Sequence, residues 1–174
     1  RTKTDRFARI VLIGAADSTP YTNVVVLLSF WRGLLFPRRM VRKVDMGKRL
    51  TVLVMDDAAV VRSLLVAMLA DIESVNSVLQ AEDASSALNL IERHKPEVAI
   101  LDVKVPGQGP IRNGIDVLKR VKKTQPDTSV IMLTNHATSR YKAECEQAGA
   151  DYFFDKSSEF ERLLDTVAAL AERM

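Results

Sequence analysis

The stretch LTVLVMDDAAVVRSLL, residues 50–65, decides the fold of this chain. It begins with the apolar run Leu50–Met55, whose β-branched members are typical of a strand buried on both faces of a sheet. Two adjacent acids, Asp56 and Asp57, interrupt this run. Beyond them, apolar residues such as Leu64 recur at helical spacing through residues 58–70. The stretch therefore predicts a buried strand, an acidic turn and a helix that packs on the sheet.

The same alternation continues along the chain. Short apolar runs predict four more strands, at residues 77–81, 98–101, 130–133 and 152–154. Helical spacing predicts four more helices, at residues 84–94, 114–123, 138–148 and 158–173. We expect Asp83 or Ser85 to cap the second helix and Gly149 to end the fourth. Five strands that alternate with five helices predict an α/β fold with a doubly wound parallel sheet.

Charge is distributed unevenly over the chain, which has a net charge of +3. Residues 1–49 carry 11 Lys and Arg against 3 Asp and Glu, a net charge of +8. Residues 50–174 carry 14 against 19, a net charge of −5. No helix-turn-helix is predicted after the last helix. The domain is acidic, and we therefore expect no specific DNA binding by this chain.

Cysteine and histidine usage excludes two kinds of site. The single cysteine, Cys145, cannot form an internal disulfide and is expected to be a reduced thiol in a helix. The two histidines, His94 and His136, are too few and too far apart for a zinc cluster of His and Cys ligands.

Residues 1–49 do not follow the pattern of the rest. They hold two apolar stretches, residues 10–16 and 24–36, which are flanked by basic residues and are short for a membrane-spanning helix. Three interpretations stay open: a non-native or unstructured extension ahead of Met46, an arm that docks on the domain or on a second copy, and a membrane-associated segment. We predict a poorly structured N-terminal extension over residues 1–49 and a folded domain over residues 50–174.

Polar residues follow or close four of the predicted strands. They are Asp56, Asp57, Asp102, Thr134 and Lys156. The carboxyl ends of parallel strands share one edge of a sheet, so these residues are expected to meet in one pocket. Carboxylates suit Mg²⁺, and a hydroxyl and an ammonium suit a phosphoryl group. Taken singly, each residue has an ordinary explanation as a helix cap, a turn residue or a surface lysine.

Residues 50–174 resemble the receiver domain of two-component response regulators, with its chemotaxis-regulator-like fold. Four strings carry the resemblance in the family's order: LTVLVMDDAAVVRSLL, PEVAILDVKVPG, VIMLTNHA and AGADYFFDKS. The resemblance implies a flavodoxin-like sheet with the strand order 2-1-3-4-5. It also implies a phosphorylation-dependent signalling switch in a phosphorelay.

The resemblance gives each residue of the pocket a role. Asp102 would be the phosphoacceptor, and Lys156 would pair with the phosphoryl group. Mg²⁺ would be held by Asp57 directly, by Asp56 mainly through water, by Asp102, and by the main-chain carbonyl of Lys104.

The resemblance also implies partners. A sensor histidine kinase or a phosphotransfer protein would present a phosphohistidine to the domain. The domain would be cytoplasmic. It would catalyse its own phosphorylation and dephosphorylation, but it would not be a turnover enzyme. Thr134 and Phe153 would then shift. The face formed by residues 138–148, 152–154 and 158–173 would change its contacts with a downstream protein, and the same face would support a homodimer.

The chain departs from the family's usual pattern at several positions. Residues 108–112 lengthen the loop after Asp102, which is rich in Gly and Pro and is not expected to be regular structure. Asn135 stands where a small residue is usual and is expected to slow phosphoryl transfer. Ser157 stands where Pro is usual, and Ser157 or Ser158 could cap the last helix.

Two more residues are candidates for tuning the lifetime of the phosphoryl group. Lys104 and His136 occupy variable positions that flank this group in the family. We hypothesise that they crowd the attacking water and prolong the phosphorylated state. The alternative is that both are ordinary solvated side chains of surface loops.

Three other functions are alternatives to that of a stand-alone receiver. The chain could be the receiver module of a longer response regulator. An aspartate-nucleophile phosphatase would carry a second Asp two residues after the nucleophile, where this chain has Lys104. A receiver-like module that has lost phosphorylation would not need the complete set of Asp102, Thr134 and Lys156.

Overall fold

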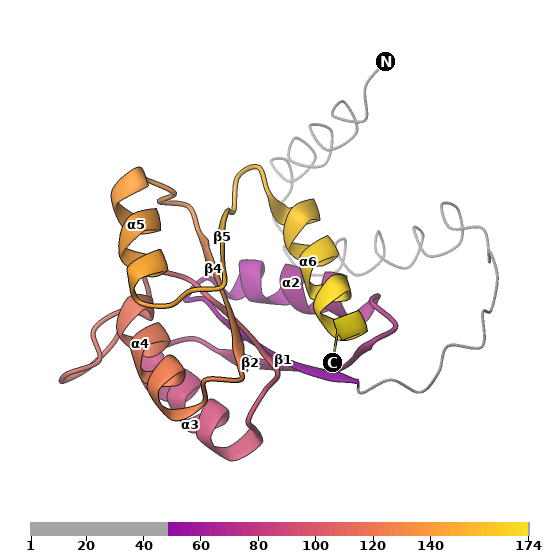
Figure 1. Cartoon of the computed structure of the whole chain (residues 1–174), viewed down its shortest axis with the longest axis horizontal. Helices are drawn as coiled ribbons and strands as arrows, with labels where there is room; N and C mark the ends of the chain where they lie inside the picture. The colour runs from indigo at the N-terminus through magenta and orange to yellow at the C-terminus, as the bar shows by residue number, and fades with distance from the viewer. Residues whose placement is uncertain (1–48, 174) are drawn as a thin grey trace, which may run out of the picture. The chain divides into compact units, whose positions relative to one another are not determined.

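A five-stranded parallel sheet forms the centre of the computed structural model, which describes residues 49–173 (Figure 1). The strands lie in the order β2-β1-β3-β4-β5. Their bounds are β1 (Leu50–Met55), β2 (Val75–Ala81), β3 (Val98–Leu101), β4 (Ser129–Thr134) and β5 (Tyr152–Asp155). Every neighbouring pair is parallel. The predicted strand order is therefore confirmed.

The helices of the described part of the chain cover both faces of this sheet. They are α2 (Ala59–Ala70), α3 (Ala84–His94), α4 (Gly114–Thr124), α5 (Ser139–Gln147) and α6 (Phe160–Arg173). Helices α3, α4 and α5 lie on one face, and α2 and α6 lie on the other (Figure 1). The predicted doubly wound fold is confirmed.

Alternate residues of the central strands build two separate cores. On β1, Leu53 and Met55 pack with α3, α4 and α5, whereas Val52 and Val54 pack with α2 and α6. Successive side chains of a strand point to opposite faces, so a strand covered on both faces is apolar at every buried position. This explains why the sequence of β1 shows an apolar run instead of an alternation.

Several details differ from the prediction. β2 begins at Val75, two residues earlier than expected, because residue 75 pairs with Leu50 in the sheet. Leu64 was expected to face the sheet, but its exposed fraction is 46%. α6 begins at Phe160, and the hydroxyl of Ser157 donates to Asp155 within the turn that precedes the helix.

The predicted ends of two helices can be compared directly with the structure. Asp83, and not Ser85, caps α3, and its carboxylate accepts a hydrogen bond from the main-chain N–H of Ser86 at 2.7 Å. Gly149 follows α5 with a φ of +95°, the left-handed conformation that favours glycine.

The predicted N-terminal extension lies, apart from Arg49, outside the described residues. The domain boundary at residue 50 therefore stays a prediction. Within residues 49–173, none of the helices combines the length and the apolar character needed to cross a membrane.

Candidate functional site

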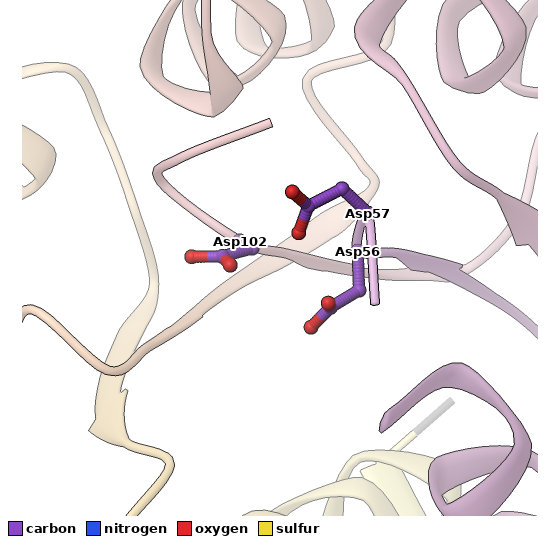
Figure 2. A group of neighbouring side chains, drawn as sticks. All are labelled: Asp56, Asp57 and Asp102. Atoms are coloured by element: carbon purple, nitrogen blue, oxygen red, sulfur yellow. The ribbon is translucent and has the colours of Figure 1, made fainter. Parts of the chain in front are cut away.

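Three carboxylates meet where β1 and β3 end. The two strands are neighbours in register, with Met55 beside Leu101, so the acids that follow them share one edge of the sheet. The N–H of Asp102 donates to the main-chain oxygen of Met55 at 2.9 Å and ties the two strand ends together. The carboxylates of Asp56, Asp57 and Asp102 each offer an oxygen within 4.8 Å of the others (Figure 2).

The two adjacent acids of this cluster have different environments. Asp56 is buried, and its Oδ1 accepts a hydrogen bond from the main-chain N–H of Ala58 at 3.0 Å. Asp57 is exposed, and its carboxylate makes no hydrogen bond or ion pair with any residue of the described part of the chain. Asp57 does not cap α2, whose N-cap residue is Ala58. Asp57 thus presents free oxygens to an incoming ion.

Lys156 is a buried cation between two of the carboxylates. It follows β5, its exposed fraction is 6%, and its Nζ lies 2.6 Å from Oδ2 of Asp102 and 2.5 Å from Oδ2 of Asp56. Burial disfavours the charged ammonium, but the hydrogen bonds and charges of Asp102 and Asp56 outweigh burial and raise the pKa of Lys156. The lysine is therefore charged at neutral pH and does not extend into solvent.

Thr134 ends β4 on the same edge of the sheet. Its side chain is buried, and its Oγ1 accepts a hydrogen bond from the main-chain N–H of His136 at 3.2 Å. Its main-chain oxygen accepts one from the N–H of Lys156 at 3.1 Å. Thr134 and Lys156 are therefore held as neighbours by the main chain.

The remaining predicted residues surround this cluster. The main-chain N–H of Lys104 donates to Oδ1 of Asp102 at 3.3 Å. The side chains of Lys104, Asn135 and His136 are exposed. Phe153, on β5, is half-buried and packs on the side of the sheet that α3, α4 and α5 cover.

The donor set of the pocket fits a divalent cation. Carboxylate oxygens are the ligands that Mg²⁺ prefers, and the ion usually takes one or two of them. Among the described residues, Lys156 is the cation that pairs with this cluster, and it contacts Asp56 and Asp102 but not Asp57, so the three carboxylates keep negative charge after Lys156 is counted. Asp56, Asp57 and Asp102 are the residues that could hold such an ion.

Two residues of the site were not identified from the sequence. The Nη1 group of Arg62 donates to the main-chain oxygens of Asp56 at 2.6 Å and of Asp57 at 3.1 Å. Gly114 begins α4 and packs against the main chain of Asp102. Arg62 did carry a signal, because a basic residue near the start of a helix is disfavoured by the helix dipole.

Comparison with known proteins agrees with this geometry. The family model of the response regulator receiver domain matches residues 52–168. The chain belongs to this family. The receiver domains of two-component systems are signalling modules, and the five-stranded fold described above is that of the family.

Individual relatives carry the same domain. Response regulator GacA of Pseudomonas aeruginosa is 34% identical over 116 residues, which cover 67% of this chain and 52% of GacA. The signal receiver domain of the putative response regulator NarL from Mycobacterium tuberculosis is 31% identical, with a TM-score of 0.64, and the match covers 72% of this chain and 98% of that one.

A third relative, RcsB, has been solved in two forms. The isolated receiver domain of RcsB from Salmonella enterica, in the presence of the phosphomimetic BeF3⁻, is 26% identical with a TM-score of 0.66, covering 72% of this chain and 90% of that one. A complex of RcsB with DNA matches equally well over 72% of this chain and 61% of that one. The match with the curated relative GacA spans about half of the length of GacA.

Proposed function

We propose that the domain accepts a phosphoryl group on Asp102, in a Mg²⁺-dependent reaction, from the phosphohistidine of a sensor histidine kinase or a phosphotransfer protein. The observation that carries this proposal is the position of Lys156, whose ammonium lies 2.6 Å from Asp102, one of three clustered carboxylates. A carboxylate that is buried beside a cation and close to two further acids is better explained by phosphoryl transfer than by a structural role.

The proposed transfer begins at a carboxylate oxygen of Asp102. This oxygen attacks phosphorus, the P–N bond to the donor histidine breaks, and its electron pair passes to the imidazole nitrogen. Asp57, Asp102, the main-chain carbonyl of Lys104 and, mainly through water, Asp56 would hold Mg²⁺, which when bound would supply positive charge to offset that of the phosphoryl oxygens. Lys156 would exchange its bond to Asp102 for one to the phosphoryl group. The domain would catalyse its own modification without being a turnover enzyme.

The proposed switch uses residues at the ends of β4 and on β5. Thr134 would donate its hydroxyl to the new phosphoryl group, and Phe153 would change its packing beside α5. The face built from α5, β5 and α6 would then shift between two states and change its contacts with a downstream protein or with a second copy.

Three exposed residues are proposed to set the rates. Asn135 would narrow access to the phosphoryl group, and Lys104 and His136 would crowd the water that hydrolyses it. Exposed side chains next to Asp102 and Thr134 support this proposal. The combined variant Lys104→Ala with His136→Ala should shorten the lifetime of phosphorylated Asp102, and an unchanged rate of dephosphorylation would refute the tuning role.

The output of the whole protein is a separate proposal. RcsB has been solved bound to DNA, and GacA is about twice as long as the region that matches this chain. The expectation of no specific DNA binding was drawn for this chain and stays a prediction, and it does not extend to a longer protein. As the receiver module of a longer response regulator, the domain would control an effector elsewhere in the protein. As a stand-alone receiver, it would act through protein contacts.

Binding of beryllofluoride, a phosphoryl mimic, tests the proposed chemistry. The wild-type chain should bind beryllofluoride only when Mg²⁺ is present, and Asp102→Asn should abolish this binding. A wild-type chain that fails to bind beryllofluoride at saturating Mg²⁺ would refute the proposal. Steady hydrolysis of a phosphate monoester by the wild type, lost in Asp102→Asn, would instead favour the phosphatase.

A further inference from the structure

The turn between β5 and α6 is organised by Asp155. The ladder of the sheet ends at this residue, so the main-chain groups beyond it need other partners. The side-chain Oδ1 of Asp155 accepts hydrogen bonds from the N–H of Ser157 at 2.8 Å and from its hydroxyl at 2.6 Å. The main-chain oxygen of Asp155 accepts from the N–H groups of Ser158 at 3.3 Å and Glu159 at 2.9 Å. Four hydrogen bonds thus converge on one residue.

Glu159 braces the same turn from α6. Its Oε2 accepts a hydrogen bond from the main-chain N–H of Asp155 at 2.9 Å. Its other carboxylate oxygen pairs with Arg162. The guanidinium of Arg162 also lies over the ring of Phe154, 5.4 Å from the ring centroid. The turn is therefore tied both to the helix that follows it and to the strand that precedes it.

Lys156 is the residue that this turn encloses. It lies between Asp155 and Ser157, and its main-chain N–H is held by the carbonyl of Thr134. Its Nζ reaches across the pocket to Asp102. A lysine side chain is a point charge on a flexible four-carbon stem, so a fixed main chain helps to keep its ammonium in place.

We propose that Asp155 is a positioning residue for Lys156, which fixes the main chain on both sides of the lysine so that the ammonium meets the phosphoryl group on Asp102. This inference rests on the proposed function of the site. Asp155 would act only through the turn, without touching the metal or the phosphoryl group. The bonds from the side chain and main chain of Ser157 also hold the pKa of Asp155 below its usual value, so its carboxylate is charged at neutral pH.

Positioning can be distinguished from ordinary capping of α6. A residue that only stabilises the helix would change the stability of the fold. It would not affect the affinity for the phosphoryl mimic more than the affinity for Mg²⁺. Lys156 is a cation and cannot ligate a metal, so misplacing it should weaken binding of the phosphoryl mimic and leave the three carboxylates free to bind Mg²⁺. The difference between these two affinities is the signature of positioning.

Calorimetric titration of the full chain tests this inference. Mg²⁺ is titrated alone, and beryllofluoride is then titrated at saturating Mg²⁺, for wild type, Asp155→Ala, Asp155→Asn and Ser157→Ala. Asp155→Ala should lose about 10-fold in beryllofluoride affinity, because a small misplacement of a binding group is costly, and should keep its Mg²⁺ affinity within about twofold. Asp155→Asn keeps an acceptor oxygen and should recover most of the loss. Ser157→Ala removes one bond and should lose about threefold.

Matched controls separate this inference from the function on which it rests. Asp165→Ala removes the same charge from an exposed position of α6 and should match the wild type for both ligands. Wild-type beryllofluoride affinity in both Asp155→Ala and Ser157→Ala would overturn the positioning role, as would equal losses for the two ligands. Failure of the wild type itself to bind beryllofluoride would refute the proposed function instead.

Discussion

Gly114 lies so close to Asp102 that a Cβ on the glycine would fall 1.8 Å from the main-chain oxygen of the aspartate. The main chain of either α4 or the candidate phosphoacceptor must therefore move if any side chain is introduced. We expect Gly114→Ala to cost about 1–3 kcal/mol of stability, as overpacking usually does, and to weaken Mg²⁺ binding about 10-fold. Urea unfolding and a Mg²⁺ titration measure the two effects.

Gly109 provides the control for this variant. Its φ is +61° and an added Cβ would meet nothing within 4 Å, so Gly109→Ala strains the main chain without a clash. It should cost about 1–2 kcal/mol and leave Mg²⁺ affinity unchanged. Equal Mg²⁺ affinity in the two variants would show that Gly114 does not support the site.

Lys156→Met should destabilise the domain by about 3–5 kcal/mol, because it leaves Asp56 and Asp102 buried without their cation. The pKa of Lys156 is raised in the folded protein. Its contribution is therefore fully present below the unfolded-state pKa of about 10.5 and is lost as pH rises through the higher folded value. Urea unfolding should show a constant gap between wild type and variant from about pH 7 to 9 that narrows above about pH 10.5. A gap that closes already below about pH 9 would contradict this assignment.

Arg62→Met should cost about 1.5–3 kcal/mol, because its guanidinium donates to the main-chain oxygens of Asp56 and Asp57. Glu82 lies 3.8 Å from the other side of the guanidinium and is exposed, so Glu82→Gln should change stability by less than about 0.5 kcal/mol. Urea unfolding of both variants measures these changes in stability. A loss as large in Glu82→Gln as in Arg62→Met would mean that Arg62 acts through this ion pair.

Cys145 should be inert in the folded protein. Burial, with smaller contributions from Glu144 and Glu146, raises the pKa of its thiol to about 11. At about pH 8 only about a thousandth of such a thiol is ionised, and the thiolate is the reactive form. An aromatic disulfide reagent should therefore react slowly in buffer and rapidly in urea. An exposed thiol introduced by Ser85→Cys, in a Cys145→Ala background, should react at once, and rapid labelling of native Cys145 would contradict its burial.

Some elements of the fold were predicted to the residue. Leu50–Met55, Ala84–His94 and Val98–Leu101 have the expected bounds. The two strands lie side by side in the sheet under both helical layers, so their apolar runs end where burial ends. Asp83 is the N-cap of the helix, and its capping hydrogen bonds are to residues close in sequence. Local chemistry was sufficient in each case.

Other elements were predicted less well because neighbours distant in sequence decide them. β2 is an edge strand, and its start at Val75 follows from pairing with Leu50 and not from its own polar residues. Leu64 has helical spacing but is exposed, whereas Leu65 and Leu69 of the same helix are buried. A periodic pattern shows which face of a helix is apolar, but it does not show how far another element extends over that face.

The order of the elements, and the placement of Asp56, Asp57, Asp102, Thr134 and Lys156 at the ends of four of the strands, could be predicted from the sequence alone. Parallel strands share a carboxyl edge, so that order was enough to bring these residues to one side of the sheet. The pairing of Lys156 with both Asp56 and Asp102, and the exposure of Asp57 to solvent, could not be predicted without the folded structure. Those pairings depend on side-chain directions and main-chain turns from different strands, and their geometry arises only when the strands pack together.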